Sequence, residues 1–289
     1  TPDACVDEAA GDITIETSLL EARPVWGAQD LYQAFRAAFN ARFVPLRFFD
    51  AKVAEQTQRH LRLDDSAYKL EPNLKDSPGG LRDLHTIHWL AQASGLASGW
   101  NSLVQAGLLM APEARRIAGA ERWLAQLRIQ LHLLAHRRED RVAFDYQKEL
   151  AECFGLQATL HLRADERLMQ GYYRAAKLVQ RANDILLQSL RAHLQPDDSS
   201  PLVLDEDFQV RSHVLQARNP SLFLDKPNAL LRAFIVYAQH PELAGFEPAT
   251  LRALWRASTQ IDAAFRADPA NRASFITLLR QPTGITRAL

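Results

Sequence analysis

The sequence predicts a mainly α-helical fold, in which a helical bundle domain is followed by a small C-terminal unit of a β-hairpin and helices. Three observations favour this fold. Apolar residues recur at steps of three and four over long stretches, which is the period of an amphipathic helix. Strand-like patterns are confined to residues 18–26 and 201–215. With 289 residues, 47% of them hydrophobic, the chain can bury a sizeable core and form more than one domain.

The helical period is found in five segments before residue 195, namely 30–43, 48–62, 81–93, 112–136 and 160–194. In the fourth segment the apolar residues form one stripe, made of Ile117, Ala120, Leu124, Leu127, Leu131 and Leu134. The fifth has a similar stripe, made of Leu168, Tyr172, Ala176, Val179, Leu186 and Leu190. Stripes of this kind bury one face of each helix, so we expect the helices to pack as a bundle.

Two segments carry strand signals. SLLEARPVW (18–26) places an acid between apolar residues and is interrupted by a proline, and PLVLDEDFQVRSHVL (201–215) has β-prone runs around an acidic turn. QPDDSSP (195–201) contains no apolar side chain except proline, so it predicts a linker and a domain boundary. Beyond it, helices are expected near residues 226–240, 248–257 and 271–280.

The charge balance and the cysteine content narrow the class of protein. Lysine plus arginine and aspartate plus glutamate both number 34, which gives no electrostatic reason to expect nucleic acid or a membrane as a partner. No apolar run approaches the ~20 residues that span a bilayer, and two cysteines are too few for a disulfide framework. We therefore expect a cytoplasmic protein. Its ends, TPDACVDEAA and PTGITRAL, predict an internal fragment of a longer chain.

The segment LEPNLKDSPGGLRDLHTIHWLA (70–91) has an unusual helix entrance. Asp76 or Ser77 can cap the helix, and Pro78 suits the first helical position, where its missing N–H is no loss. Gly79 and Gly80 are poor helix formers and cost about 1 kcal/mol each relative to alanine. A cost of that size calls for a structural or functional reason.

Two explanations fit the glycines. The first is an anion site, in which unshielded first-turn N–H groups and the flanking Lys75 and Arg82 receive a phosphate or a carboxylate. The second is a tight loop, in which the glycines let another backbone approach and the two cations pair with Glu71, Asp76 or Asp83. The residues alone leave both explanations open.

Other patterns give weaker signals. His132 and His136 are four residues apart on a predicted helix, and His85 and His88 are three apart, so each pair could chelate a metal. Neither pair has an evident third ligand, so packing or hydrogen bonding is the preferred interpretation. The sequence contains no Gly-x-Ser-x-Gly, Cys-x-x-Cys or Walker A pattern, which leaves hydrolase, redox and P-loop functions without support.

The segment YKLEPNLKDSPGGLRDLHTIHWLA resembles part of the bifunctional PII uridylyltransferase/uridylyl-removing enzymes. Further segments are similar to the same family in the same order: DITIETSLLEARPVWGAQDLYQAF (12–35), AKVAEQTQRH (51–60), LHLLAHRREDRVAFDYQKELA (131–151) and FITLLRQPTGITRAL (275–289). The resemblance therefore covers nearly the whole chain.

This resemblance implies a domain organisation and an activity. Residues 1–28 would be the trailing part of a polymerase-β-like nucleotidyltransferase palm, 29–196 a helical domain, and 201–289 the approach to an HD phosphohydrolase domain. The parent enzyme would transfer UMP from UTP to a tyrosine of a PII nitrogen-regulatory protein with Mg²⁺, and would remove it when glutamine is abundant.

The same resemblance suggests roles for individual residues. Glu21 aligns by pattern with a third carboxylate of the palm, so it is the candidate catalytic residue and Mg²⁺ ligand. The alternative is a glutamate on an edge strand, paired with Arg23 or exposed to solvent. With the helical domain closed over the nucleotide, the expected nucleotide-binding residues are Lys75, Ser77, Gly79, Gly80 and Arg82.

The chain also lacks two motifs of the family, the Gly-Ser-x-x-Asp metal motif and an adjacent His-Asp pair. We therefore expect the isolated fragment to be inactive. The alternatives are a helical scaffold or protein-interaction module without a small-molecule site, and a nucleotidyltransferase with a different protein target.

Overall fold

A computed structural model describes residues 1–63, 69–97, 99–195 and 200–281 of the chain. The chain divides into two units, residues 1–195 and 196–289. Residues 196–199 of the predicted linker and residues 282–289 at the end of the chain lie outside the described residues.

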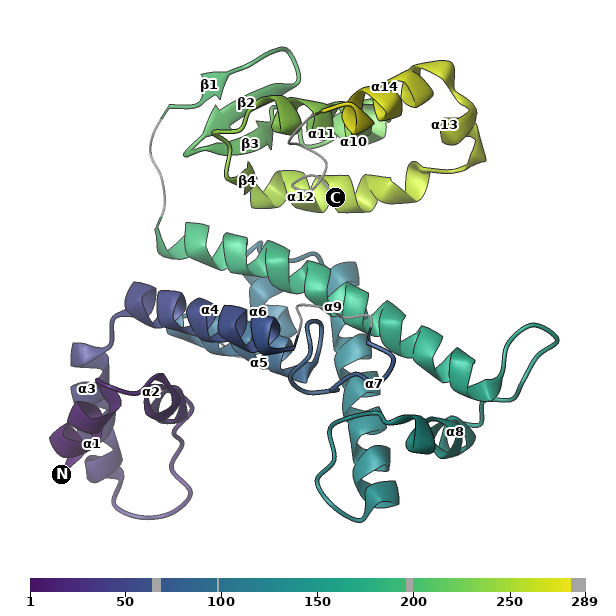
Figure 1. The fold of residues 1–289 in the computed structure, drawn as a ribbon. Coiled ribbons are helices and arrows are strands. Elements are labelled where there is room, and N and C mark those ends of the chain that lie inside the picture. The colour runs from purple at the N-terminus through teal and green to yellow at the C-terminus, as the bar shows by residue number, and fades with distance from the viewer. Residues whose placement is uncertain (64–68, 98, 196–199, 282–289) are drawn as a thin grey trace. The chain divides into compact units, whose positions relative to one another are not determined.

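The first unit is built around α9 (Ala164–Leu194), which contacts four other helices of the bundle: α4 (Pro45–Arg62), α5 (Leu81–Ala93), α7 (Ala111–Ala135) and α8 (Phe144–Cys153). Figure 1 shows α7 crossing α9, and α4 and α5 lie on the same side of α9. The short α6 (Trp100–Gln105) packs on α7. The apolar stripes predicted for the two longest helices are confirmed, since Ile117, Leu124, Leu131, Tyr172 and Val179 are all fully buried.

The start of the unit is also helical. It comprises α1 (Pro2–Ala9), α2 (Ile13–Leu20) and α3 (Gln29–Arg42). The strand predicted at residues 18–26 is therefore wrong. Asp12 caps α2 by accepting a hydrogen bond of 2.6 Å from the Thr14 amide. This cap favours a helix, and its effect outweighs the strand preference of the β-branched residues in α2. A loop of residues 21–28 then leads to α3, and Figure 1 shows it arching away from the helices.

The second unit combines a small sheet with helices. Strands β1 (Leu202–Val203), β2 (Phe208–Arg211) and β3 (Val214–Ala217) are antiparallel neighbours. The predicted hairpin around the acidic turn corresponds to β1 and β2, and β3 extends it. The unpredicted β4 (Gly245–Phe246) adds to β3 in parallel, giving the order β1-β2-β3-β4. The β2–β3 turn is made by Ser212 and His213, which both have positive φ angles.

The helices of this unit are α10 (Leu222–Asp225), α11 (Ala229–Gln239), α12 (Pro248–Ala257), α13 (Ala263–Ala267) and α14 (Pro269–Leu279), with a 3₁₀ turn at Ser258–Gln260. The three helices predicted beyond the linker correspond to α11, α12 and α14. Their apolar faces and the sheet share a core that contains Phe208, Leu215, Phe223 and Ala233. Within the described residues of the two units, no helix is both long and apolar enough to cross a membrane.

Candidate functional site

The turn that precedes α5 is held by its own side chains. The Asn73 carboxamide oxygen accepts hydrogen bonds from the amides of Lys75 and Asp76, at 3.0 and 2.7 Å, and the Ser77 hydroxyl accepts from the Asn73 amide at 3.1 Å. The helix begins only at Leu81. The predicted cap by Asp76 or Ser77, with Pro78 as the first helical residue, is therefore wrong: the Ser77 hydroxyl bonds within the preceding turn, and the Asp76 carboxylate lies beside Arg82.

The amides of the glycine segment are not open to a ligand. The Gly79 amide donates to Asp83 Oδ2 at 2.8 Å, and the Gly80 amide donates to the Ser77 carbonyl at 2.8 Å. The next two amides donate to the carbonyls of Leu74 and Lys75, at 3.0 and 2.8 Å. The expectation of unshielded first-turn N–H groups is wrong, because the chain itself satisfies these donors.

Gly79 instead allows two backbones to meet. It has a φ of +77°, and a Cβ at this position would lie 2.7 Å from the carbonyl carbon of Ala176 on α9, and closer still to its oxygen. At Gly80 a Cβ would lie 2.7 Å from the Lys75 carbonyl oxygen. Both glycines are buried. The second explanation from the sequence, a tight loop against another backbone, is confirmed for Gly79.

Asp83 links this turn to α4. Its carboxylate is fully buried and accepts hydrogen bonds from Gln56 at 2.8 Å and from His60 at 2.9 Å, and it forms an ion pair with Arg59. Burial alone would raise the pKa of Asp83, but the hydrogen bond and charge of His60, the Gln56 amide and the Arg59 charge together lower it. A buried, ionised carboxylate therefore anchors the entrance of α5.

This cluster was not predicted from the sequence, although a signal was present. Gln56, Arg59 and His60 follow the i, i+3, i+4 spacing that places side chains on one helix face. Polar residues at that spacing, directed towards the core face of an amphipathic helix, require a buried partner. Asp83, the only acid in the GGLRD run, was the nearest candidate in the motif.

Lys75 and Arg82, the two cations expected to bind a phosphate, lie beside different acids. Lys75 lies near Asp140, on the α7–α8 connection. Burial would raise the pKa of Asp140, but hydrogen bonds from Arg128 and His132 lower it, and the charge of Lys75 adds to this lowering. Arg82 lies over the Trp89 ring, at 5.5 Å, and its Nε is 3.7 Å from Asp76. Both side chains are partly exposed.

Glu21 ends helix α2 and is exposed, so its expected position on a strand is wrong. It lies near α5, because the Gln92 side chain donates to the neighbouring Leu20 carbonyl at 2.8 Å and the Glu21 charge acts on the His85 imidazole. Burial first, and then the charge of Arg82, lower the pKa of His85, which is therefore a neutral imidazole near pH 7. Arg82 and Glu21 thus each lie within electrostatic reach of His85.

One histidine of each predicted pair lies beside a carboxylate. His88 lies 3.6 Å from Glu121, which also accepts a 2.7 Å hydrogen bond from the Trp100 indole, and His132 lies 3.2 Å from Asp140. In the described part of the chain, no three His, Cys, Asp or Glu side chains are placed to hold a metal ion. Glu21 as a Mg²⁺ ligand remains a prediction.

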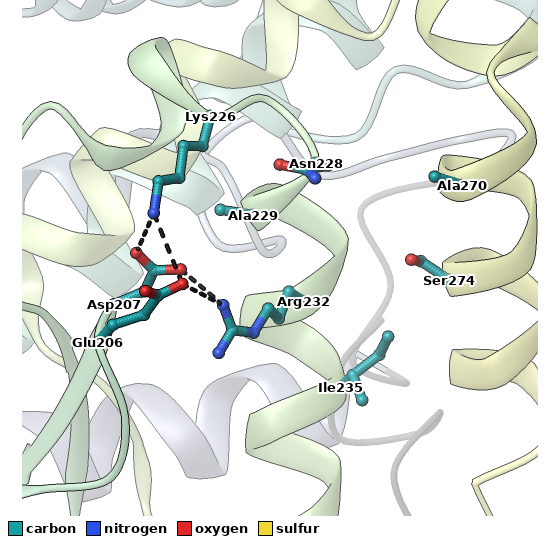
Figure 2. A pocket seen from close by; sticks show the side chains of 9 residues that line it. All are labelled: Glu206, Asp207, Lys226, Asn228, Ala229, Arg232, Ile235, Ala270 and Ser274. Carbon is teal, nitrogen blue, oxygen red and sulfur yellow. Dashed lines mark hydrogen bonds and ion pairs between the residues drawn. The ribbon is translucent and has the colours of Figure 1, made fainter.

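The C-terminal unit has a cavity of about 220 Å³ beside α11. Figure 2 shows Glu206, Asp207, Lys226 and Arg232 on one side of it and α14 on the other. The Asp207 carboxylate is nearly buried and accepts from Lys226 at 3.0 Å and from Arg232 at 2.6 Å. Since each cation already has an acidic partner, this cluster fastens the β1–β2 turn to α11.

Comparisons with known proteins support the resemblance. A family model described as GlnD PII-uridylyltransferase matches residues 47–187, and another, described as the third domain of uridylyltransferase GlnD, matches residues 208–289. No solved structure matches the chain.

Several curated relatives share the name bifunctional uridylyltransferase/uridylyl-removing enzyme. The chain is 68% identical to the protein of Thiobacillus denitrificans over all 289 residues. It is 48% identical to the protein of Chromobacterium violaceum, again over 100% of this chain. The protein of Bordetella avium is 48% identical over 286 residues, or 99% of the chain. In each case the chain spans about a third of the relative's length, between 33% and 34%.

The two matched family models and the named relatives belong to one class of protein, the uridylyltransferases, which are nucleotidyltransferases. From its likeness along both units, the chain belongs to the GlnD uridylyltransferase family.

Proposed function

We propose that this chain is the central part of a longer enzyme that transfers UMP from UTP to a tyrosine of a PII protein and removes it in response to glutamine. The observation that carries the proposal is 68% identity over the whole chain to a bifunctional uridylyltransferase/uridylyl-removing enzyme. The description of the first matching family, PII-uridylyltransferase, supports the protein substrate.

The proposed reaction has two directions. In transfer, the tyrosine oxygen attacks the α-phosphorus of UTP, the bond to the pyrophosphate breaks, and the tyrosine proton is lost to a base. In removal, water attacks the phosphorus of the UMP group and the tyrosine oxygen leaves as the hydroxyl. Mg²⁺ bound by carboxylates would neutralise the phosphate oxygens in transfer. Within this chain, Glu21 remains the proposed Mg²⁺ ligand.

Fewer residues are proposed to contact the nucleotide than the family resemblance implied. Ser77, Gly79 and Gly80 form the turn, and their buried groups bond within the chain. We propose that they position the partly exposed side chains of Lys75 and Arg82, which contact the phosphates. Arg82 is the better placed of the two, because it shares its surroundings with His85 and Glu21.

The test uses the full-length enzyme. Lys75→Ala and Arg82→Ala should each raise the dissociation constant for magnesium-UTP about ten-fold or more, because a hydrogen bond to a charged group contributes about 1.5–3 kcal/mol. Arg163→Ala is a matched control, since it removes an exposed cation from the start of α9. Wild-type affinity in both variants would remove the nucleotide role.

A helical scaffold without a small-molecule site remains the alternative for the chain by itself. It is favoured by the α5 entrance, where the turn's own acceptors take the amides that would bind a phosphate. Calorimetric titration of the 289-residue chain with magnesium-UTP separates the two possibilities. Binding by the chain would refute the scaffold, whereas binding by the full-length enzyme alone would assign the chain a supporting role.

A further inference from the structure

The apolar stripe of α3 is only partly covered. Leu31, Phe35, Phe39 and Phe43 follow one another at steps of four and therefore share one face of the helix. Phe39 is 2% exposed and its ring lies 5.0 Å from that of Phe43, whereas Leu31 is 61% exposed. The core face of this helix thus continues beyond the point where the described residues cover it.

The adjoining loop adds two larger apolar side chains. Trp26 is 97% exposed and Val25 is 84% exposed. The loop is attached to α3, because the Tyr32 hydroxyl donates to the Ala22 carbonyl at 2.9 Å. An unburied tryptophan beside an uncovered helix face is typical of an interaction site, since apolar patches on soluble proteins tend to be small.

We propose that Val25, Trp26 and Leu31 form a docking surface, here called the Trp26 surface, which is covered by the part of the full-length polypeptide that lies outside residues 1–289. This inference rests on the proposed function, which places the chain within a longer enzyme. The relatives match all of this chain, yet they are about three times as long, since the chain spans 34% of the first of them.

The matches to the family models do not include this surface. The first model begins at residue 47, so residues 1–46 belong to neither matched domain. All three residues of the Trp26 surface lie in that segment. A segment that joins two domains is expected to carry an interface with the second one, and such interfaces within a chain bury about 600–1,500 Å².

The area of the surface favours an intramolecular partner over a second copy. Three side chains of this size expose on the order of 400 Å². Two such patches facing each other bury about 800 Å², less than the ~1,200 Å² at which stable interfaces between separate chains begin. A segment of the same polypeptide is held at high effective concentration, so a small surface suffices.

The first experiment measures acrylamide quenching of Trp26 as the difference between wild type and Trp26→Phe. In the 289-residue chain, Trp26 should be quenched as readily as a free tryptophan. In the full-length enzyme its quenching constant should fall at least three-fold. Equal quenching in the two proteins would overturn the proposal, as would protection of Trp26 in the short chain that increases with its concentration, the sign of a second copy.

The second experiment compares melting temperatures in the same two proteins. Trp26→Ala should lower the melting temperature of the full-length enzyme by several degrees and leave that of the 289-residue chain unchanged. Leu160→Ala is the matched control, because Leu160 is also 97% exposed but lies between α8 and α9, and it should change neither protein. Equal effects of the two substitutions on the full-length enzyme would contradict the docking surface.

The outcomes separate this inference from the proposed function. An enzyme that uridylylates PII but leaves Trp26 open to acrylamide refutes the docking surface alone. An enzyme that protects Trp26 but does not modify PII refutes the proposed function and leaves the docking surface standing.

Discussion

Gly79→Ala tests why the entrance of α5 contains glycine. The substitution has two costs. An L-residue in the left-handed region, here at a φ of +77°, costs about 1–2 kcal/mol. The added methyl group would also overlap the Ala176 backbone, and overpacking of this kind costs about 1–3 kcal/mol. We therefore expect the free energy of unfolding of the first unit to fall by about 2–5 kcal/mol.

Gly95→Ala is a matched control for the first cost. Gly95 has a φ of +78°, nearly the same as Gly79, and a Cβ there would meet nothing within 4 Å. It should lose about 1–2 kcal/mol. Both substitutions reduce the entropy of the unfolded chain equally, so their difference isolates the close approach to Ala176. Ala176→Gly should not rescue Gly79→Ala, because the overlap is with the backbone.

The assay is urea unfolding followed by tryptophan fluorescence. A Trp255→Phe background removes the tryptophan of the second unit and leaves those at positions 26, 89, 100 and 123, all within the first. The two glycine variants are compared by their midpoints at a shared m-value. If the loss of unfolding free energy for Gly79→Ala is within about 0.5 kcal/mol of the loss for Gly95→Ala, the packing explanation is refuted. Effects of separate substitutions are comparable only to about that precision.

Three other predictions concern buried polar groups. Asp83→Asn should destabilise the first unit by about 3 kcal/mol, because it leaves the largely buried Arg59 without a counter-charge. Since the folded-state pKa of Asp83 is lowered, its contribution is fully present above pH ~4 and is lost as the pH falls through the folded pKa. The urea midpoints of wild type and variant should therefore differ by a constant amount from pH 7 down to about pH 4 and converge only below that pH. Tyr172→Phe should leave stability unchanged or raise it by up to about 1 kcal/mol, because the buried Tyr172 hydroxyl has no hydrogen-bond partner among the described residues; a clear loss in urea unfolding would reveal a partner. Asp207→Asn should lower the stability of the second unit in thermal unfolding by about 1–3 kcal/mol. Glu206→Gln, at a side chain that is 75% exposed, should change that stability by no more than about 0.5 kcal/mol. Equal losses in the two variants would refute the role given to Asp207.

The long helices could be predicted from the sequence because their signal is local and repeated. The stripe of α9 extends from Leu168 to Leu190 over several turns, so a single irregular residue does not hide it. Segment 18–26 failed because its pattern was short. There, Asp12 started a helix six residues before the segment, and the Thr17 hydroxyl bonds back to the Ile13 carbonyl at 2.6 Å, which accommodates a β-branched residue within the helix.

The short strand β4 could not be predicted for a similar reason. It consists of Gly245 and Phe246, and two residues carry no period. Its position comes from partners more than 30 residues earlier, since the Ala244 amide donates to the His213 carbonyl and the Glu247 amide to the Leu215 carbonyl, at 2.6 and 2.8 Å. Such pairing depends on tertiary structure rather than on local preference.

The α5 entrance shows what a motif leaves undecided. Two glycines between cations are equally consistent with an anion site and with a close approach of backbones, because both need a small residue. The choice depends on Asp83, four residues after Gly79, and on Ala176, in a helix far along the chain. The first takes the amide and the second fills the space, and a carboxylate oxygen already occupies the place where a phosphate oxygen would accept from Gly79. A phosphate could reach this amide only by displacing the buried Asp83 carboxylate, which would take its counter-charge from the largely buried Arg59. Any nucleotide contact in this region must therefore come from side chains at the surface of the turn, and the substitutions at Lys75 and Arg82 address it more directly than any change to the glycines.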